Sequence, residues 1–426
     1  MDKQNGLPIL SDLNCNKINL GLGPIKKLLK KIGNPQFMYP TVLIGGTNGK
    51  GSIAAFLSSI IRKSGYKVGL YTSPHLISIL ERIRINDSLI SEERMRECVG
   101  FISSHVKDSL TYFEYLTASA FLYFYQEKVD IAVLEVGMGG RLDATNVVKP
   151  ILSVISNIHR DHEEYLGRHL KHIACEKAAI IKENNICITA VSQKDIIKIL
   201  DDTCRRKRAN LLRLGKDIHV RLKGNGQFSY QGPGLKIANL YSSLSGVHQV
   251  KNAALALAAA ELITAKGIKV TEEAMITGVA SATWEGRLEI LQKMPTVIVD
   301  GAHNLSAVAV LCDELRQRNS LTRNILIFGV LQDKNYRLML KKLLPFFQHI
   351  IFTRPKTERA VDVDLLMKMA QEYGHFSEAI ENCREALKRA LSLAGNKDLI
   401  CATGSLYLVG EIKKIYAEGV SLNNRE

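Results

Sequence analysis

The chain has 426 residues, which is more than a single compact core usually holds and predicts two domains. Hydrophobic residues make up 46% and charged residues 23% of the sequence, which excludes a largely disordered protein. The formal net charge of +15 calls for an anionic partner. A small anionic substrate such as ATP explains this charge better than nucleic acid, because no motif that reads DNA or RNA accompanies it.

The cysteines and the apolar segments bear on where the protein acts. The eight cysteines include no CxxC pair, which favours reduced thiols over disulfides or a metal site. The first five residues lack the apolar run of a signal peptide. The most apolar helix-like stretch, residues 253–260, stops at Glu261 and is too short to cross a bilayer. We therefore expect a cytoplasmic protein with no membrane partner.

Short apolar runs alternate with longer helical patterns along the chain, which predicts parallel β-sheets covered by helices. The first set of expected strands is 41–44, 67–71, 130–136, 151–156 and 186–191. A polar, Gly-rich region at 215–246 is expected to be rich in β-structure, and residues 249–265 are expected to be helical. A second set of expected strands follows at 296–300, 324–329, 349–353 and 398–402.

The gap between the two sets of strands predicts the domain boundary. The fold class is α/β, with a parallel-sheet ATPase domain that contains a phosphate-binding loop (P-loop) and a smaller, Rossmann-like α/β domain after it. We expect the ATP-binding domain at 1–285, a hinge linker at 286–295 and the second domain at 296–426.

A phosphate-binding loop is predicted at Gly45-Gly46-Thr47-Asn48-Gly49-Lys50-Gly51-Ser52, between the apolar strand 42–44 and a helix at 53–64. Glycines let backbone N–H groups face an anion, and the start of the helix adds its dipole. Lys50 supplies a positive charge for the β and γ phosphates, and Ser52 a hydroxyl for phosphate or Mg²⁺. Only two residues separate Gly46 from Gly49, unlike the common Walker A spacing, so a turn without a ligand stays an alternative.

Polar side chains that follow other expected strands predict a metal site. Glu135 ends the apolar strand at 130–135, and metal binding is the more economical role for a buried carboxylate. The Gly-rich loop 136–146 follows, at the edge where open α/β sheets bind ligands. Ser73, after the second strand, offers a further oxygen ligand.

Two histidines and a lysine leave alternatives open. Mg²⁺ prefers oxygen, so the residues alone favour His159 and His162 as ordinary loop histidines. Lys177 lies near the start of an apolar segment, and the residues alone indicate a surface lysine. The alternative is a partly buried lysine that takes up CO₂ and becomes an anionic ligand.

Together these motifs resemble the folylpolyglutamate synthase and dihydrofolate synthase family, within the Mur ligase superfamily. The matching segments run along nearly the whole chain: 46–52, 73–76 with 81–83, 111–114, 134–146, 161–162, 176–178, 300–304 and 404–407.

The resemblance implies a set of site residues. The implied ATP contacts are Thr47, Asn48, Gly49, Lys50, Gly51, Ser52, Asn252, Arg287 and Asp300. The implied ligands of two Mg²⁺ ions are Ser52, Ser73, Glu135, His162 and a carbamylated Lys177. The implied pterin-binding positions are Lys17, Ile18, Asn19, Leu20, Thr111, Tyr112, Phe113, Glu114 and Leu142. The implied catalytic groups are Lys50, Lys177, Asp300 and His303, the last near the incoming glutamate.

The resemblance also implies an activity: an ATP-dependent ligase that joins L-glutamate to dihydropteroate, to the γ-carboxylate of folylglutamates, or to both, through an acyl phosphate. We expect the bifunctional enzyme, acting as a monomer on small molecules. The alternatives are a folylpolyglutamate synthase only, a Mur-type ligase that acts on a cell-wall nucleotide precursor, and a nucleotide-binding switch or nucleic-acid-associated ATPase.

Overall fold

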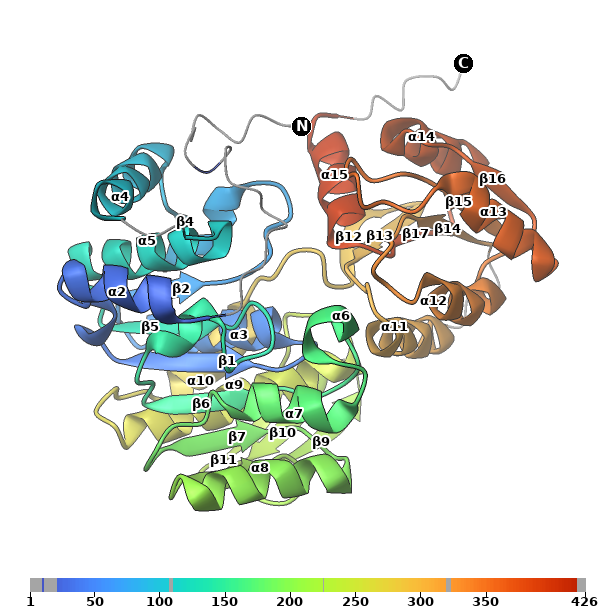
Figure 1. The fold of residues 1–426 in the computed structure, drawn as a ribbon. Helices are drawn as coiled ribbons and strands as arrows, with labels where there is room; N and C mark the ends of the chain where they lie inside the picture. Colours follow the sequence, from blue (N-terminus) through green and yellow to red (C-terminus); the bar gives the residue numbers. More distant parts are fainter. Residues whose placement is uncertain (1–9, 11–20, 107–109, 225, 319–322, 420–426) are drawn as a thin grey trace. The chain divides into compact units, whose positions relative to one another are not determined.

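The computed structural model describes residues 10, 21–106, 110–224, 226–318 and 323–419 (Figure 1). The chain forms two compact units. The first comprises Met1–Ser243 with Val247–Trp284, and the second comprises Leu244–Gly246 with Glu285–Glu426.

The first unit is built on an eight-stranded sheet in the order β4-β3-β2-β5-β1-β6-β7-β8. Its strands are β1 (Thr41–Gly45), β2 (Val68–Tyr71), β3 (Ile83–Ile85), β4 (Ser88–Leu89), β5 (Ile131–Glu135), β6 (Leu152–Ile155), β7 (Ile186–Thr189) and β8 (Asn210–Arg213). The six strands in the row β2-β5-β1-β6-β7-β8 are all parallel, and only the pairs β2–β3 and β3–β4 at one edge are antiparallel. The loops that follow β1, β2, β5 and β6 therefore emerge at one edge of the sheet.

Helices cover both faces of this sheet (Figure 1). They are α2 (Gly23–Lys31), α3 (Lys50–Lys63), α4 (Glu92–His105), α5 (Tyr112–Gln126), α6 (Glu163–Leu166), α7 (Leu170–Ala178), α8 (Lys194–Arg206), α9 (Val247–Thr264) and α10 (Glu272–Ser281), with short 3₁₀ turns η1 (Pro35–Phe37), η2 (Ile79–Arg82) and η3 (Ala144–Val147). Helix α3 packs against α9 and α10. A separate antiparallel sheet comprises β9 (His219–Gly224), β10 (Gln227–Gln231) and β11 (Lys236–Tyr241).

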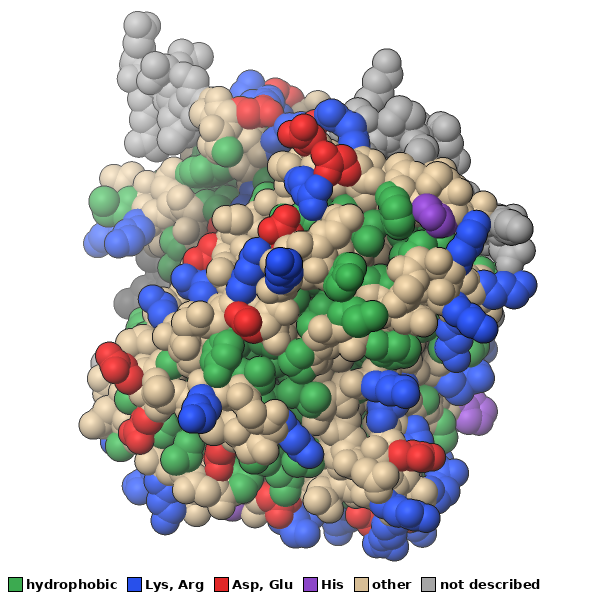
Figure 2. All heavy atoms as spheres, turned by 90° about the vertical axis from the view of Figure 1, so that its left-hand side faces the viewer, with side chains coloured by type: hydrophobic (Ala, Val, Ile, Leu, Met, Phe, Trp, Pro, Cys, Tyr) green, Lys and Arg blue, Asp and Glu red, His purple; other side chains and the backbone are tan. Residues whose placement is uncertain are grey.

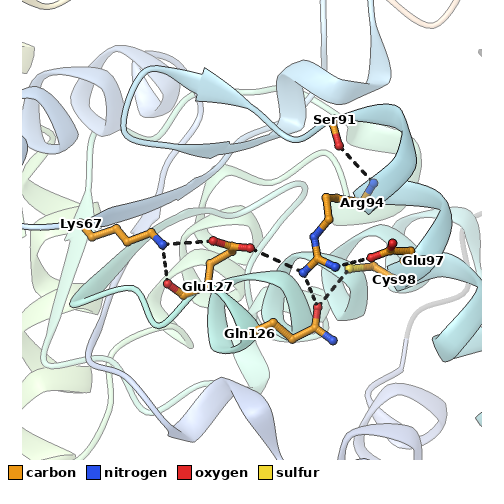
Figure 3. Close-up of polar contacts among 7 residues, drawn as sticks. All are labelled: Lys67, Ser91, Arg94, Glu97, Cys98, Gln126 and Glu127. Atoms are coloured by element: carbon orange, nitrogen blue, oxygen red, sulfur yellow. Dashed lines mark hydrogen bonds and ion pairs between the residues drawn. The ribbon is translucent and has the colours of Figure 1, made fainter.

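A polar network joins α4, α5 and the start of β2 (Figure 3). The Glu127 carboxylate accepts a hydrogen bond from Lys67 Nζ at 3.1 Å and lies 3.5 Å from Arg94 Nη2. The same Arg94 nitrogen donates to Gln126 Oε1 at 3.0 Å, and the Arg94 backbone N–H donates to Ser91 Oγ at 3.1 Å, which caps α4. Arg94 therefore joins α4 to the end of α5, and Glu127 extends the network to Lys67 before β2.

The second unit has a six-stranded sheet in the order β12-β13-β17-β14-β15-β16. Its strands are β12 (Glu289–Lys293), β13 (Thr296–Asp300), β14 (Asn324–Phe328), β15 (His349–Phe352), β16 (Ser377–Ala379) and β17 (Leu399–Thr403). Its helices are α11 (Leu305–Gln317), α12 (Tyr336–Leu343), α13 (Val363–Glu372), α14 (Cys383–Leu393) and α15 (Leu406–Ala417), with the turn η4 (Leu344–Phe346). All its strand pairs are parallel except β12–β13.

The expected α/β fold class is confirmed, and the expected strands coincide with the observed ones within about two residues at each end. The segment 286–295 differs from the expected linker, because residues 289–293 form β12 and pair with β13. Strand β12 lies at the sheet edge and has no fully buried residue, so its sequence lacks the apolar run that marks the central strands.

The surface carries mixed charge on the face that Figure 2 shows: Lys and Arg side chains are spread over it and interleaved with Asp, Glu and hydrophobic side chains. On this face the positive charge is not gathered into one field. Within the described ranges, no helix combines the length and the apolar character that crossing a membrane requires.

Candidate functional site

The predicted phosphate loop connects the fully buried strand β1 to helix α3. Gly46 and Gly49 have φ values of +133° and +83°, which side chains rarely tolerate. A Cβ at Gly46 would lie 1.9 Å from Ser156 Oγ, and a Cβ at Gly49 would lie 2.6 Å from Asn252 Oδ1. The loop therefore needs glycine at both positions. Because Gly49 has no side chain, Asn252 of α9 can lie against the start of α3.

Contacts with the segment after β6 hold this loop in place. The Thr47 N–H donates to the Asn157 carbonyl at 2.8 Å, and the Asn48 N–H donates to Asn157 Oδ1 at 3.0 Å. The Asn48 carbonyl accepts a hydrogen bond from Ser156 Oγ at 2.6 Å. The loop is thus fixed by hydrogen bonds to a neighbouring loop, which is the preorganisation that phosphate binding requires.

Two side chains at the start of α3 have properties suited to phosphate. Lys50 Nζ donates to the Thr47 carbonyl at 3.2 Å, so its ammonium group folds back over the loop. Ser52 is 1% exposed, and within the described part of the chain its Oγ has no hydrogen-bond partner. A buried hydroxyl without a partner is costly, and a phosphate oxygen or a metal ion would satisfy it.

The carboxylate of Glu135 lies at the centre of the site. Glu135 is the last residue of β5 and is 4% exposed. One of its oxygens accepts the Ser73 N–H at 3.1 Å, and the other lies 3.9 Å from Lys50 Nζ. The structure therefore brings Lys50, Ser73 and Glu135 together from the ends of three adjacent parallel strands.

The oxygen groups of Ser52, Ser73 and Glu135 suit a hard cation such as Mg²⁺. In the described ranges, no three side chains drawn from His, Cys, Asp and Glu alone are clustered so that they could hold a metal. A metal here would thus depend on hydroxyls, on phosphate oxygens or on a modified lysine.

Lys177 is a buried lysine beside the loop. It lies in α7, is 5% exposed, and its Nζ donates to the Gly46 carbonyl at 2.7 Å. The indication of a surface lysine from the residues alone is therefore wrong. Burial, and then the positive charge of Lys50, lower the pKa of Lys177 to about 7. A sizeable fraction of this amine is neutral at physiological pH and so able to react with CO₂.

The two loop histidines follow β6. The backbone N–H of His159 donates to Thr47 Oγ1 at 3.0 Å, and its carbonyl accepts from the same hydroxyl at 3.2 Å. Burial lowers the pKa of the His159 side chain. His162 has a φ of +51° and precedes α6, and its N–H donates to Asp161 Oδ1 at 2.9 Å. His159 thus contacts the phosphate loop through its backbone.

The segment 111–114 forms the start of α5. Thr111 and Glu114 make a capping box, in which Glu114 Oε2 accepts both the Thr111 N–H and the Thr111 hydroxyl at 2.9 Å. Glu114 Oε1 is buried and has no hydrogen-bond partner in the described residues. A Cβ on Gly137 would lie 2.6 Å from Phe113 Cζ, so the aromatic ring packs on the loop that carries Leu142. The predicted positions 17–20 lie outside the described residues.

In the second unit, the predicted residues Arg287, Asp300 and His303 lie around the end of β13. Asp300 Oδ2 accepts the Leu288 N–H at 2.9 Å, and Oδ1 accepts the Ala302 N–H at 3.0 Å. His303 Nδ1 lies 2.8 Å from the Gly301 carbonyl, which only accepts, so this nitrogen carries the proton. A Cβ on Gly301 would lie 2.2 Å from Arg287 Nη1, so Arg287 lies close over the Gly301 backbone.

Sequence reasoning missed two features of the first unit. The Trp284 ring packs on Gly51 so closely that a Cβ there would lie 2.6 Å from Trp284 Cζ2. Arg82 Nε donates to His75 Nδ1 at 2.9 Å, and its guanidinium lies 5.7 Å from the centroid of the Tyr112 ring. The sequence signal for the second feature is the segment 81–83, to which the family resemblance assigns no role.

Comparisons with known proteins agree with this arrangement. The Mur ligase middle domain model matches residues 44–260, and the Mur ligase glutamate ligase domain model matches residues 286–406. A dihydrofolate synthase/folylpolyglutamate synthase of Bacillus subtilis is 37% identical over 410 residues, which cover 92% of this chain and 94% of the relative.

Two solved structures are similar over nearly the whole chain. The structure of Escherichia coli FolC with DHPP and ADP has a TM-score of 0.89 and 30% identity, with 97% of each chain covered. A bifunctional folylpolyglutamate synthase/dihydrofolate synthase with Mn, AMPPNP and L-glutamate has a TM-score of 0.86 and 27% identity, with 96% of each chain covered.

Proposed function

We propose that this chain adds L-glutamate both to dihydropteroate and to the γ-carboxylate of folylglutamates. The premise is that the chain belongs to the dihydrofolate synthase/folylpolyglutamate synthase family of Mur ligases. It is an ATP-dependent ligase. The observation that carries the proposal is the cluster of Lys50, Ser73 and Glu135 around a phosphate loop whose Ser52 hydroxyl is buried without a partner among the described residues.

ATP and a divalent metal are the proposed cofactors, and the ligands named for the two similar solved structures support them. The loop from Thr47 to Ser52, together with Asn252, would hold the phosphates. Ser52, Ser73, Glu135 and His162 are the proposed metal ligands. A bound divalent ion would supply positive charge to the phosphate oxygens.

The reaction activates a carboxylate, which is a poor acyl donor because its oxygen leaves badly. The acceptor carboxylate attacks the γ-phosphorus of ATP, the bond to the β,γ-bridging oxygen breaks, and ADP leaves. Lys50 and the loop N–H groups stabilise the charge on the transferring phosphoryl group. The glutamate amine then attacks the acyl phosphate, loses a proton, and phosphate leaves with the formation of an amide.

Carbamylation of Lys177 is part of the proposal. A neutral amine adds to CO₂ and releases a proton, which yields a carbamate anion. The burial of Lys177 and its contact with Gly46 support this role, because its neutral form is favoured and its Nζ faces the loop. The carbamate would place an anionic oxygen ligand where the unmodified lysine offers none.

The remaining residue roles are also proposals. Arg287 and Asp300 are nucleotide contacts, and His303, with Nε2 as the basic nitrogen of its neutral form, acts near the incoming glutamate. The pterin-binding positions are 17–20, 111–114 and Leu142. We propose a monomer in the cytoplasm, and the seven described cysteines, all free, support a reducing compartment.

The test is phosphate release from ATP in the presence of glutamate with dihydropteroate, tetrahydrofolate or a uridine-nucleotide cell-wall precursor as acceptor. Turnover with both pterins supports bifunctionality, turnover with one pterin reduces the proposal to that half, and turnover with the cell-wall precursor alone refutes it.

The matched variants are Lys50→Ala and Lys63→Ala, which remove a lysine from opposite ends of α3. Lys50→Ala should lower kcat about 100-fold or more, as the loss of a group that stabilises transition-state charge does. Lys63 is exposed, so its variant should retain activity. Equal activity of the two variants would refute the phosphate-loop assignment.

A further inference from the structure

Arg82 is a half-buried cation that takes no part in the proposed reaction steps. It ends η2, and its carbonyl accepts the Thr72 N–H at 3.0 Å, one residue before Ser73. Its Nε donates to His75 Nδ1, which fixes His75 as a neutral acceptor on that side. In the described part of the chain, no carboxylate pairs with Arg82 and no group accepts a hydrogen bond from its Nη atoms.

The carboxylate of the preceding residue, Glu81, does not pair with the Arg82 guanidinium. Glu81 accepts three backbone N–H groups, from Leu76 at 2.8 Å, Ile77 at 2.9 Å and Ser78 at 2.7 Å. These bonds fix the loop that follows Ser73 and direct the Glu81 carboxylate away from its neighbour. Among the described residues no anion therefore compensates the charge of Arg82, and a bound anionic ligand could do so.

The position of Arg82 identifies which anion. Its guanidinium stacks on Tyr112 in the proposed pterin segment, while its backbone lies beside the loop that carries the proposed metal ligand Ser73. Arg82 thus contacts both the segment proposed for the pterin and the segment that leads to Ser73, and an acceptor with its pterin at 111–114 and its reactive carboxylate near Lys50 would extend between these two segments. A folylglutamate brings a second carboxylate along this path, whereas dihydropteroate has only the carboxylate that reacts.

We propose that Arg82 binds the α-carboxylate of the terminal glutamate in folylglutamate acceptors and so determines how well they compete with dihydropteroate. This inference rests on the proposed function. The guanidinium offers two Nη groups to the two carboxylate oxygens, and Tyr112 and His75 hold its plane. Binding of the α-carboxylate leaves the γ-carboxylate unpaired and nucleophilic for attack on ATP.

The experiment measures each enzyme variant with each of three acceptors, as in a double-mutant cycle in which one of the changes is made in the substrate. Wild type and Arg82→Gln are assayed with tetrahydrofolate, with its α-carboxamide analogue and with dihydropteroate. For wild type, the carboxamide should lower kcat/KM about 10- to 100-fold, the value of a charge-assisted hydrogen-bonded pair. Arg82→Gln should show a similar loss with tetrahydrofolate, little further loss with the carboxamide, and near-wild-type kcat/KM with dihydropteroate.

Arg84→Gln is the matched control, because Arg84 also stacks on an aromatic ring, that of Trp284, two residues further along. It should leave the ratio between the three acceptors unchanged. Equal losses of Arg82→Gln with all acceptors, or an undiminished preference of this variant for carboxylate over carboxamide, would overturn the proposal.

Retained turnover of dihydropteroate shows that Arg82→Gln is folded, and thermal unfolding checks this independently. If wild type turns over no folylglutamate, the proposed function fails as well; if wild type does so without preferring carboxylate to carboxamide, only the Arg82 inference fails.

Discussion

Replacement of Gly51 by alanine tests the packing of Trp284 on the phosphate loop. Gly51 is the second residue of α3, where alanine would ordinarily be favoured over glycine by about 0.5–1 kcal/mol. The new Cβ, however, would lie 2.6 Å from Trp284 Cζ2 and 2.8 Å from Cε2 and Nε1. Ordinary carbon contacts lie at about 3.5–4.0 Å, so the ring or the helix must move by about 1 Å.

Forced overpacking of this kind costs about 1–3 kcal/mol. We therefore expect Gly51→Ala to lower the free energy of unfolding by about 1–2 kcal/mol and to raise the KM for ATP, because the loop amides are displaced. Denaturant unfolding and steady-state kinetics measure the two effects. The control is Gly100→Ala in α4, where a Cβ would meet no atom within 4 Å.

Gly100→Ala should be stabilising by about 0.5–1 kcal/mol with unchanged ATP kinetics. The double variant Gly51→Ala/Trp284→Leu should recover part of the free energy of unfolding that Gly51→Ala loses, because leucine at position 284 leaves space for the new methyl group. If Gly51→Ala proved as stable as Gly100→Ala, the close contact between the ring and the loop would be refuted.

Three further outcomes are expected. The pKa of Lys177 is lowered to about 7 from an ordinary value of 10.5. At pH values between these two, the unfolded chain therefore binds a proton on Lys177 that the folded chain lacks. The free energy of unfolding in CO₂-free buffer should therefore rise with pH across this window more steeply in wild type than in Lys177→Met, and equal slopes would contradict this. Arg94→Ala should cost about 0.5–1 kcal/mol in urea unfolding and more than Arg96→Ala, since Arg94 joins α4 to the end of α5 (Figure 3), whereas Arg96 pairs with Glu92 of its own helix. Thr111→Ala should cost about 1 kcal/mol through loss of the helix cap and Thr111→Ser much less, a difference that thermal unfolding measures.

Local patterns predicted much of the fold and part of the site. The apolar strand before Gly46 and the helix after it identify β1 and α3, because both elements are contiguous in sequence. Glu135 was found because a carboxylate at the end of a buried strand needs a compensating partner, such as a metal ion, to offset its loss of hydration. The edge strand β12 was missed since its residues are half exposed and carry no apolar run.

Other parts of the site depend on contacts between distant residues, which a single sequence does not encode in any local pattern. The burial of Lys177 results from packing of α7 against the phosphate loop, and its neighbours in sequence did not indicate it. The pairing of Arg82 with His75 and Tyr112 joins two segments 30 residues apart by their numbers. Only the resemblance to a known family pointed to Lys177, and it assigned no role to Arg82.

The contact between Trp284 and Gly51 also gives the protein an intrinsic optical probe. Trp284 is the only tryptophan in the chain, and its indole lies against the helix turn that follows the phosphate loop, with the Arg84 guanidinium 5.7 Å from its ring centroid. Indole emission responds to nearby charge and to polarity. Titration of the unlabelled protein with ADP or ATP should therefore change a fluorescence signal that has a single, known origin, and the dissociation constant can be read without a dye or a coupled enzyme.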